Sequence, residues 1–251
     1  MKQKKYISGR YFYKTDLGRV RLTNEDKVIA LTNARGNILL VVCDGMGGAN
    51  KGDYASSLAV NYISDAFKNK EKFFSKFSAK MWAKNVIRGA NADIYRHASS
   101  NKAFQGMGTT LTLVLIINDA MIVGQVGDSR AYSYRARNLT RLTEDQTYVQ
   151  YLFNTHQITK EEMETHPKRH VLLNALGVYP SLDLDIQTYP YFNDTLLLCS
   201  DGLYNNVSES DIANIIKSND TLEQKVNKMI SLANANGGSD NIGIVLWEAQ
   251  N

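Results

Sequence analysis

The sequence predicts an α+β fold in which antiparallel sheets are flanked by helices. Apolar, strand-like runs occur mostly in pairs joined by turn residues, which is the pattern of β-hairpins. Segments with helical spacing of apolar residues also come in pairs, and the alternation of strand and helix is weak. Hairpins favour antiparallel sheets over a doubly wound parallel sheet, because parallel neighbours need a long crossover connection.

The first half of the chain predicts a hairpin, two helices and a meander. Residues 27–44 are predicted to form two strands around a turn at 33–37, where Asn and Gly interrupt the apolar runs. Helical spacing of apolar residues follows at 52–70 and again at 79–99. Residues 109–143 predict several strands, which break at the turn pairs Asn118-Asp119 and Arg137-Asn138.

The second half predicts short helices, further strands and a C-terminal helix pair. Residues 147–166 predict two short helices, and Thr159 with Glu162 has the spacing of a capping box. Strands are predicted at 183–192, 195–201 and 241–249. Residues 208–218 and 221–237 predict helices, because each begins with Ser or Thr and carries an acidic residue or Gln three positions later.

The length fits one large domain or two small ones, and because no linker is visible we expect a single soluble domain over residues 1–251. The chain is long enough for a substantial core, and 43% apolar with 22% charged residues is ordinary for a globular protein. No apolar run reaches the roughly 20 residues that span a bilayer, and no signal-peptide pattern is visible. Cys43 and Cys199 lie inside apolar runs, which favours buried thiols over a disulfide. We therefore expect a cytoplasmic protein without membrane insertion.

Much of the net charge of +4 is local to the N-terminus. Lys2, Lys4, Lys5 and Arg10 fall within the first ten residues, so residues 1–14 are predicted to form a basic extension. Such a run can contact nucleic acid or anionic lipid, but a solvated tail is the favoured interpretation for so short a run.

Aspartates recur at the ends of apolar strands. Four share this position, each beside or near glycine: Asp44 after LLVVC, Asp128 after MIVGQVG, Asp201 after TLLLCS, and Asp240 before NIGIVLW. Glu25 and Asp26 precede another predicted strand. Because strand ends converge at the edge of a sheet core, we expect these carboxylates to lie close together.

Carboxylates packed this closely would repel one another, and a multivalent cation removes that repulsion. Ligands that are all oxygen select Mg²⁺ or Mn²⁺ over Zn²⁺. A glycine after a ligand, such as Gly45, lets the backbone approach the ion, and its carbonyl can itself be a ligand. The histidines lie outside these motifs and are interpreted as surface residues: His97, His156, His166 and His170.

The alternative for each aspartate is an ordinary turn, since Asp-Gly is a common turn pair. This alternative is weak for Asp44, Asp201 and Asp240 taken together, because all three lie at strand ends beside Gly, Ser or Asn. It is stronger for Asp128, which could cap a turn while Arg130 pairs with it.

Arg21 lies four residues before Glu25. A guanidinium fork beside hard cations is the complement expected for a phosphoryl group, which two metal ions can clamp for attack by water. A lone arginine would be an ordinary surface charge, but its place beside the acidic residues favours phosphate binding.

At this point the ordered motifs resemble a known family. The chain is similar to the bacterial branch of the metal-dependent protein phosphatase 2C (PPM) family of serine/threonine phosphatases. The resemblance runs from Thr15 almost to the C-terminus. It rests on these segments: TDLGRVRLTNED, VVCDGMGG, GMGTTLTLVLI, VGQVGDSRAY, NALG, LLLCSDGL and GGSDNIGIVL.

The resemblance implies a sandwich of two antiparallel sheets with helices on both outer faces, and two or three Mn²⁺ or Mg²⁺ ions. Asp44 would bridge two ions, and the Gly45 carbonyl would ligate one of them. Asp201 and Asp240 would ligate the other ion. The remaining implied roles are these: Glu25 acting through metal-bound water, Asp26 supporting Glu25, Asp128 with Asp201 at a third metal, and Arg21 on the substrate phosphate.

The resemblance further implies that a metal-bridging water is the nucleophile and that residues 147–173 form a flap beside the site. Met46 replaces the histidine that eukaryotic members use as a proton donor, which leaves the general acid unassigned. Gln146, Asn174 and Gly243 also depart from frequent family residues. The first two of these are expected to affect flap contacts and substrate preference.

The implied function is hydrolysis of phosphoserine and phosphothreonine on proteins, in opposition to a bacterial Ser/Thr kinase. We expect phosphorylated protein substrates and a monomer, without nucleic-acid binding. Two alternatives remain open. One is a catalytically silent binding module on the same fold, which is disfavoured because all metal ligands are retained. The other is a two-metal nuclease, which is disfavoured because the sequence shows no basic-aromatic surface.

Overall fold

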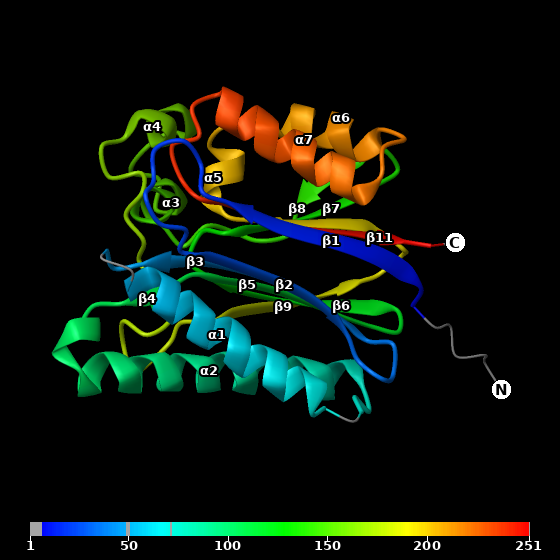
Figure 1. Ribbon diagram of the computed structural model, residues 1–251, viewed down its shortest axis with the longest axis horizontal. Helices are drawn as coiled ribbons and strands as arrows, with labels where there is room; N and C mark the ends of the chain where they lie inside the picture. The colour runs from blue at the N-terminus through cyan, green and yellow to red at the C-terminus, as the bar shows by residue number, and fades with distance from the viewer. Residues whose placement is uncertain (1–6, 49–50, 71, 251) are drawn as a thin grey trace.

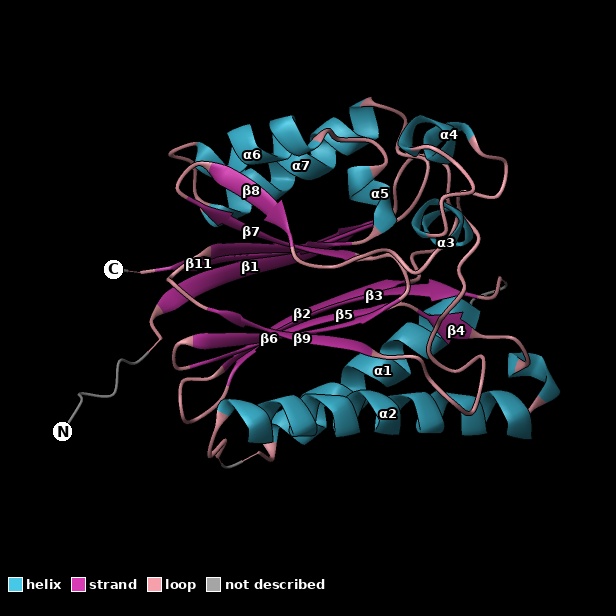
Figure 2. Cartoon of the chain, turned by 180° about the vertical axis from the view of Figure 1, so that it is seen from behind, coloured by secondary structure: helices cyan, strands magenta, loops and turns pink. Residues whose placement is uncertain are grey.

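A computed structural model describes residues 7–48, 51–70 and 72–250. Its strands form two antiparallel sheets that pack face to face, with helices on both outer faces (Figures 1 and 2). This arrangement confirms the predicted α+β sandwich. No described helix combines the length and hydropathy needed to cross a membrane.

The first sheet has the strand order β1-β11-β10-β7-β8. Its strands are β1 (Gly9–Asp16), β7 (Arg130–Arg135), β8 (Asn138–Arg141), β10 (Thr195–Cys199) and β11 (Ile242–Ala249). The second sheet has the order β2-β3-β5-β6-β9, with β4 paired to the end of β3. Its strands are β2 (Asp26–Thr32), β3 (Ile38–Met46), β4 (Gly108–Thr109), β5 (Leu111–Ile117), β6 (Ala120–Val126) and β9 (Asp185–Pro190).

Helices cover the outer face of each sheet (Figure 1). The second sheet packs against α1 (Lys51–Lys68) and α2 (Lys76–Ser100), which leads into the short η1 (Lys102–Phe104). The first sheet packs against α5 (Asp201–Tyr204), α6 (Glu209–Lys217) and α7 (Leu222–Ala235). The remaining helices, α3 (Tyr148–Asn154) and α4 (Lys160–Thr165), lie at one end of the sandwich.

A third apolar layer fills the space between the sheets. Leu40, Leu198 and Trp247 lie in it with less than 2% of their surface exposed. The indole N–H of Trp247 donates to the Tyr191 hydroxyl at 2.8 Å, so the one polar atom of this side chain is satisfied. The inner strands β3, β5, β6, β10 and β11 are therefore buried on both faces, which explains why they are nearly continuous apolar runs rather than alternating ones.

The predicted helices at 147–166, 208–218 and 221–237 are confirmed, and so is the capping box of Thr159 with Glu162. Cys43 and Cys199 are buried free thiols, as expected. The meander turn predicted at Arg137-Asn138 falls one residue earlier, because Ala136 and Arg137 take the left-handed conformation.

The predicted basic extension over 1–14 is wrong for residues 9–14, which belong to β1. This strand pairs with β11 in continuous register from Gly9↔Ala249 to Asp16↔Ile242. The sequence of β1 is not apolar enough to predict a strand, because β1 lies at an edge of the sheet and is half exposed. Its stabilisation comes from pairing with β11. Lys2, Lys4 and Lys5 lie outside the described residues.

The packing between the sheets predicts that replacing a buried leucine by alanine lowers the free energy of unfolding much more than replacing an exposed one. Leu198→Ala removes a fully buried side chain and is expected to lower the free energy of unfolding by about 2–5 kcal/mol. Leu22→Ala is the matched control, since Leu22 is 94% exposed, and should change stability by less than about 0.5 kcal/mol. Urea unfolding of both variants tests this, and equal midpoints would contradict the assigned packing.

Candidate metal and phosphate site

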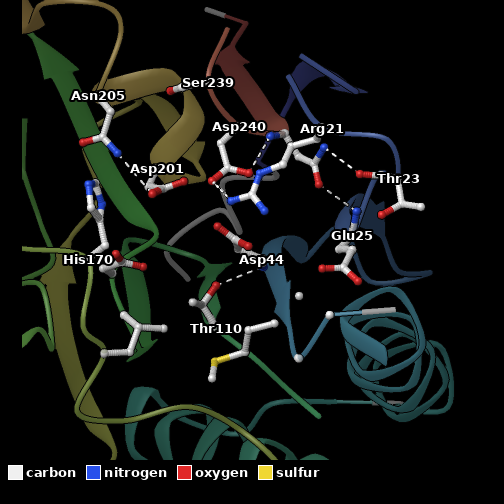
Figure 3. A pocket seen from close by; sticks show the side chains of 17 residues that line it. Arg21, Thr23, Glu25, Asp44, Thr110, His170, Asp201, Asn205, Ser239 and Asp240 are labelled. Carbon is white, nitrogen blue, oxygen red and sulfur yellow. Dashed lines mark hydrogen bonds and ion pairs between the residues drawn. The ribbon is translucent and has the colours of Figure 1, made fainter. Parts of the chain in front are cut away.

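The strand ends that carry the predicted acidic residues meet at one end of the sandwich. Asp26 begins β2 and lies opposite Asp44 near the end of β3. Asp128 follows β6, Asp201 follows β10, and Asp240 precedes β11. A cavity of about 550 Å³ lies at this end. Its lining includes Arg21, Glu25, Asp44, Gly45, Asp128, Asp201 and Asp240 (Figure 3).

Asp44 is fixed through its backbone. Its N–H donates to the Thr110 hydroxyl at 2.9 Å, and its carbonyl accepts from the Thr110 N–H at 2.8 Å. The same carbonyl accepts from the Thr109 hydroxyl at 2.9 Å. Because these bonds leave the carboxylate free, Asp44 projects into the cavity from a rigid strand end (Figure 3).

The environment of these carboxylates disfavours their charged form. Burial first, and then the charge of Asp26, raises the pKa of Asp44 well above its ordinary value. Burial and then Asp201 raise the pKa of Asp128 to about 8. Burial and then Asp240 raise the pKa of Asp201 to about 7. Burial is therefore the largest cause of the raised pKa values, and repulsion among the carboxylates adds to it.

Asp26 lies behind the cavity wall. Burial raises the pKa of its carboxyl group to about 7, and a hydrogen bond from the Ser200 hydroxyl at 2.6 Å lowers it in part. Ser200 in turn accepts from the Gly243 N–H at 2.7 Å. A Cβ on residue 243 would lie 3.1 Å from Asp26 Oδ2, so glycine leaves this buried carboxylate more room.

Several carboxylate oxygens are buried without a hydrogen-bond donor. Among the described residues these are Glu25 Oε1, Asp26 Oδ1 and Asp201 Oδ1. A buried oxygen without a partner costs about 1–3 kcal/mol, and oxygens of this kind are suited to ligate a hard cation. Within the described chain no three acidic, His or Cys side chains already converge on one point. They line facing walls of the cavity instead.

Gly45 is required by the packing of its neighbours. A Cβ at this position would lie 2.2 Å from the Gly52 carbonyl oxygen and 2.7 Å from that of Glu25. Only glycine therefore lets the end of β3 approach both the start of α1 and the segment that carries Glu25. The role of the Gly45 carbonyl as a metal ligand stays a prediction.

Arg21 lies in the cavity mouth on the loop between β1 and β2. Its guanidinium donates to Asp240 Oδ2 at 2.7 Å, and this hydrogen bond raises the pKa of Arg21. The side chain remains 53% exposed, so its other donors face the cavity and solvent. A free guanidinium edge of this kind is suited to a phosphate oxygen pair.

Asn241 holds this loop in place, and the sequence analysis did not identify it. Its side-chain oxygen accepts from the Glu25 N–H at 2.9 Å. Its amide group donates to the carbonyls of Leu17 and Thr23 at 2.9 and 3.0 Å. Its position beside Asp240 could have marked Asn241 as a site residue. Its hydrogen-bond partners could not be predicted, because they lie more than 200 residues away in the chain.

His170 is exposed, as predicted, but it also lines the cavity, so its predicted separation from the aspartate motifs is wrong. Figure 3 shows it on the wall opposite Arg21, near Asn205 and Asp201. Burial and the neighbouring Arg169 lower the pKa of His170. No sequence spacing links His170 to the aspartates, because the chain between α4 and Leu172 brings it to the cavity.

The segment predicted as a flap, residues 147–173, closes on itself at its base. Thr147 and Leu172 form an isolated antiparallel bridge, and the Tyr148 N–H donates to the Val171 carbonyl at 2.8 Å. Two of the unusual residues meet here. Gln146 Oε1 accepts from Asn174 Nδ2 at 2.7 Å and from the Gly127 N–H at 2.9 Å. They tie the flap base to the turn that presents Asp128.

Arg130 forms its ion pair with Asp145, so the pairing with Asp128 that the turn alternative proposed is not seen among the described residues. Its guanidinium instead binds Asp145 through two hydrogen bonds of 3.0 and 2.6 Å. It also stacks on the Tyr204 ring, with Cζ 3.5 Å from the ring centroid. Arg130 therefore connects Asp145, just before the predicted flap, to Tyr204 of α5.

Comparison with known proteins agrees with this geometry. The family model "Protein phosphatase 2C" matches residues 19–246. A serine/threonine phosphatase stp of Listeria monocytogenes is 39% identical over 237 residues, covering 94% of each chain. Protein phosphatase PhpP of Streptococcus pneumoniae is 33% identical over 233 residues, covering 92% of this chain and 94% of the other.

Solved structures show the same fold. Serine/threonine phosphatase Stp1 from Staphylococcus aureus superposes with a TM-score of 0.90 at 31% identity, covering 100% of this chain and 98% of the other. The catalytic domain of the phosphatase PstP, in complex with two manganese ions, gives a TM-score of 0.86 at 30% identity. It covers 98% of this chain and 100% of the other. The chain therefore belongs to the protein phosphatase 2C family of metal-dependent serine/threonine phosphatases.

Proposed function

We propose that this protein hydrolyses phosphoserine and phosphothreonine on other proteins, using two or three Mn²⁺ or Mg²⁺ ions in the acidic cavity. The observation that carries the proposal is the meeting of Asp44, Asp128, Asp201 and Asp240 with Arg21 in one cavity. Its relatives in the family are serine/threonine phosphatases, and one neighbouring structure contains manganese. The substrates are phosphorylated proteins, and the opposing enzyme is a Ser/Thr kinase of the same cytoplasm.

The donor set suits hard divalent cations. Carboxylate and carbonyl oxygens are available, and no cysteine lines the cavity among the described residues. The charges of Asp26, Asp201, Asp128 and Asp240 all raise the pKa of Asp44, so Asp44 is close to each of the other acidic groups, which suits a bridging ligand. Ions bound here would supply an activated water and would neutralise charge on the phosphoryl group.

The remaining residues position the substrate. Arg21 binds phosphate oxygens at the cavity mouth, and Asn241 fixes the loop that presents it. The flap places His170 and Leu172 on the cavity wall and so limits how a polypeptide enters. Met46 also lines the cavity, and its thioether has no proton to donate. Met46 is therefore not the general acid, and we propose that water in the cavity protonates the departing serine or threonine oxygen.

Asp44→Asn tests the metal site. The substitution removes the central carboxylate charge and is expected to lower Mn²⁺-dependent turnover of a phosphothreonine peptide by at least about 100-fold. Isothermal titration calorimetry should show weaker Mn²⁺ binding in the same variant, while circular dichroism shows the fold retained. Full turnover in Asp44→Asn, or no Mn²⁺ dependence of the natural chain, would contradict the proposal.

Arg21→Ala tests the phosphate contact. A hydrogen bond to a charged group contributes about 1.5–3 kcal/mol, so kcat/KM for the same peptide should fall roughly 10- to 150-fold. Mn²⁺ binding should be retained, because Arg21 donates to Asp240 but supplies no metal ligand. Arg19→Ala is the matched control on the same loop, and its activity should equal that of the natural chain. Equal losses in both variants would argue against a specific role.

The raised pKa values predict a pH dependence of stability in protein stripped of metal with EDTA. Folded Asp128 and Asp201, with pKa values of about 8 and about 7, hold protons that the unfolded chain has already lost. The free energy of unfolding should therefore fall as pH rises from about 4 to about 8. In Asp128→Asn the fall should be smaller, and saturating Mn²⁺ should also reduce it. Urea unfolding at several pH values measures the slope, and a steeper fall in Asp128→Asn would refute this electrostatic assignment.

A further inference from the structure

The end of the molecule opposite the metal cavity carries an unusual combination of exposed phenylalanines and cations. Phe74, Phe77 and Phe192 are 81%, 73% and 60% exposed. Large apolar side chains at this exposure, gathered at one end of a fold, mark an interaction surface. We define the distal basic face by six residues: Phe74, Phe77, Phe192, Lys72, Lys76 and Arg135.

Strand topology places this face away from the cavity. The carboxylates lie where β3, β6 and β10 end, whereas the distal face lies where those strands begin. The β5–β6 turn at Asn118-Asp119 belongs to this second end, because Ile117 pairs with Ala120 there. In Figure 1 the first turn of α2 lies to the right, and β4, α3 and α4 lie to the left, beside the site.

Contacts link the members of the face. Lys76 pairs with Asp119 at 3.0 Å, and the carbonyl of Asp119 accepts from the Tyr191 N–H at 2.9 Å. The next residue, Phe192, carries the guanidinium of Arg135 over its ring at 4.5 Å. Residues of α2, the β5–β6 turn, the β9–β10 loop and β7 therefore form one continuous surface.

Two of the three cations of this face are paired with acidic groups, and the excess of positive charge comes from the lysines of the adjoining segment. The segment 68–84 contains six lysines and one glutamate. The acidic groups that face it from neighbouring turns already contact cations, since Asp119 pairs with Lys76 and Asp194 with Arg135 at 3.4 Å. Lys72 lies over the Phe74 ring at 5.0 Å, so cation and aromatic group are presented together. The sequence analysis was wrong to find no basic-aromatic surface, because half of this one comes from loops distant in the chain.

We propose that the distal basic face binds the surface of an anionic lipid bilayer. Its exposed rings come from separate segments, since Phe74 precedes α2, Phe77 lies in its first turn and Phe192 lies between β9 and β10. Phenylalanines flanked by lysines suit the boundary between lipid headgroups and acyl chains. Lipid phosphates supply the complementary negative charge. Binding by this end leaves the metal cavity facing away from the membrane, where it remains open to substrate.

Flotation of the full chain with vesicles tests the proposal. The protein should float with vesicles of phosphatidylglycerol and phosphatidylcholine, and much less with phosphatidylcholine alone. The double variant Lys72→Gln/Lys76→Gln should reduce partitioning roughly 30-fold, because each cation near an anionic surface contributes about fivefold. Phe77→Ser should reduce it about tenfold through the lost apolar contact.

Matched control variants show whether vesicle binding depends on this face or only on the total charge and exposed aromatic area of the protein. Arg88→Gln/Lys102→Gln removes the same charge from the rest of the α2–η1 segment, and Tyr179→Ser removes an aromatic ring that is 62% exposed elsewhere. Both controls should float like the natural chain, and thermal melts should confirm that all variants fold.

Three results would overturn the proposal. The first is absence of flotation with anionic vesicles, and the second is an equal loss in the control variants. The third is binding to a DNA duplex, lost in the Lys72/Lys76 variant, without any flotation, which would assign the face to nucleic acid. Neither the flotation nor the melts depend on phosphatase turnover, so failure here leaves the proposed activity to its own tests.

Discussion

Repulsion among buried carboxylates is the constraint on which the site depends. Asp44, Asp128 and Asp201 all have raised pKa values because burial and neighbouring acidic groups disfavour their charge. The fold keeps them together because each is anchored to a strand end whose apolar run is locked into the sandwich. A divalent cation relieves the repulsion, so the stability of this end of the molecule and its chemistry have the same physical origin.

Most of the secondary structure was predictable because the residues that determine it are close together in the sequence. Turn pairs, capping residues and long apolar runs identified most strands and helices, and the strand-end position of Asp44, Asp201 and Asp240 indicated one site. The misses depend on partners distant in the chain. β1 is stabilised as a strand by pairing with β11. Asn241 and His170 reach the cavity through a loop contact and through the chain between α4 and Leu172, which no spacing rule encodes.

Two residues that differ from the expected family pattern, Gln146 and Asn174, are in direct contact with each other. Gln146 Oε1 accepts from Asn174 Nδ2 and from the Gly127 N–H, which belongs to the turn that presents Asp128. Flap position and the geometry around Asp128 are thus mechanically linked. The sandwich also separates two surfaces by its full length, with the acidic cavity at one end and the distal basic face at the other. Each end can therefore bind its own partner without competition.

The central claim is that the strand-end carboxylates form a dinuclear or trinuclear cation site. Crystals grown with Mn²⁺ and measured near the manganese absorption edge test it most directly. We expect at least two anomalous peaks in the cavity, with Asp44 bound to both of the strongest ones and Asp201 and Asp240 on one of them. A map without a peak at Asp44, or with manganese only outside the cavity, would contradict the account.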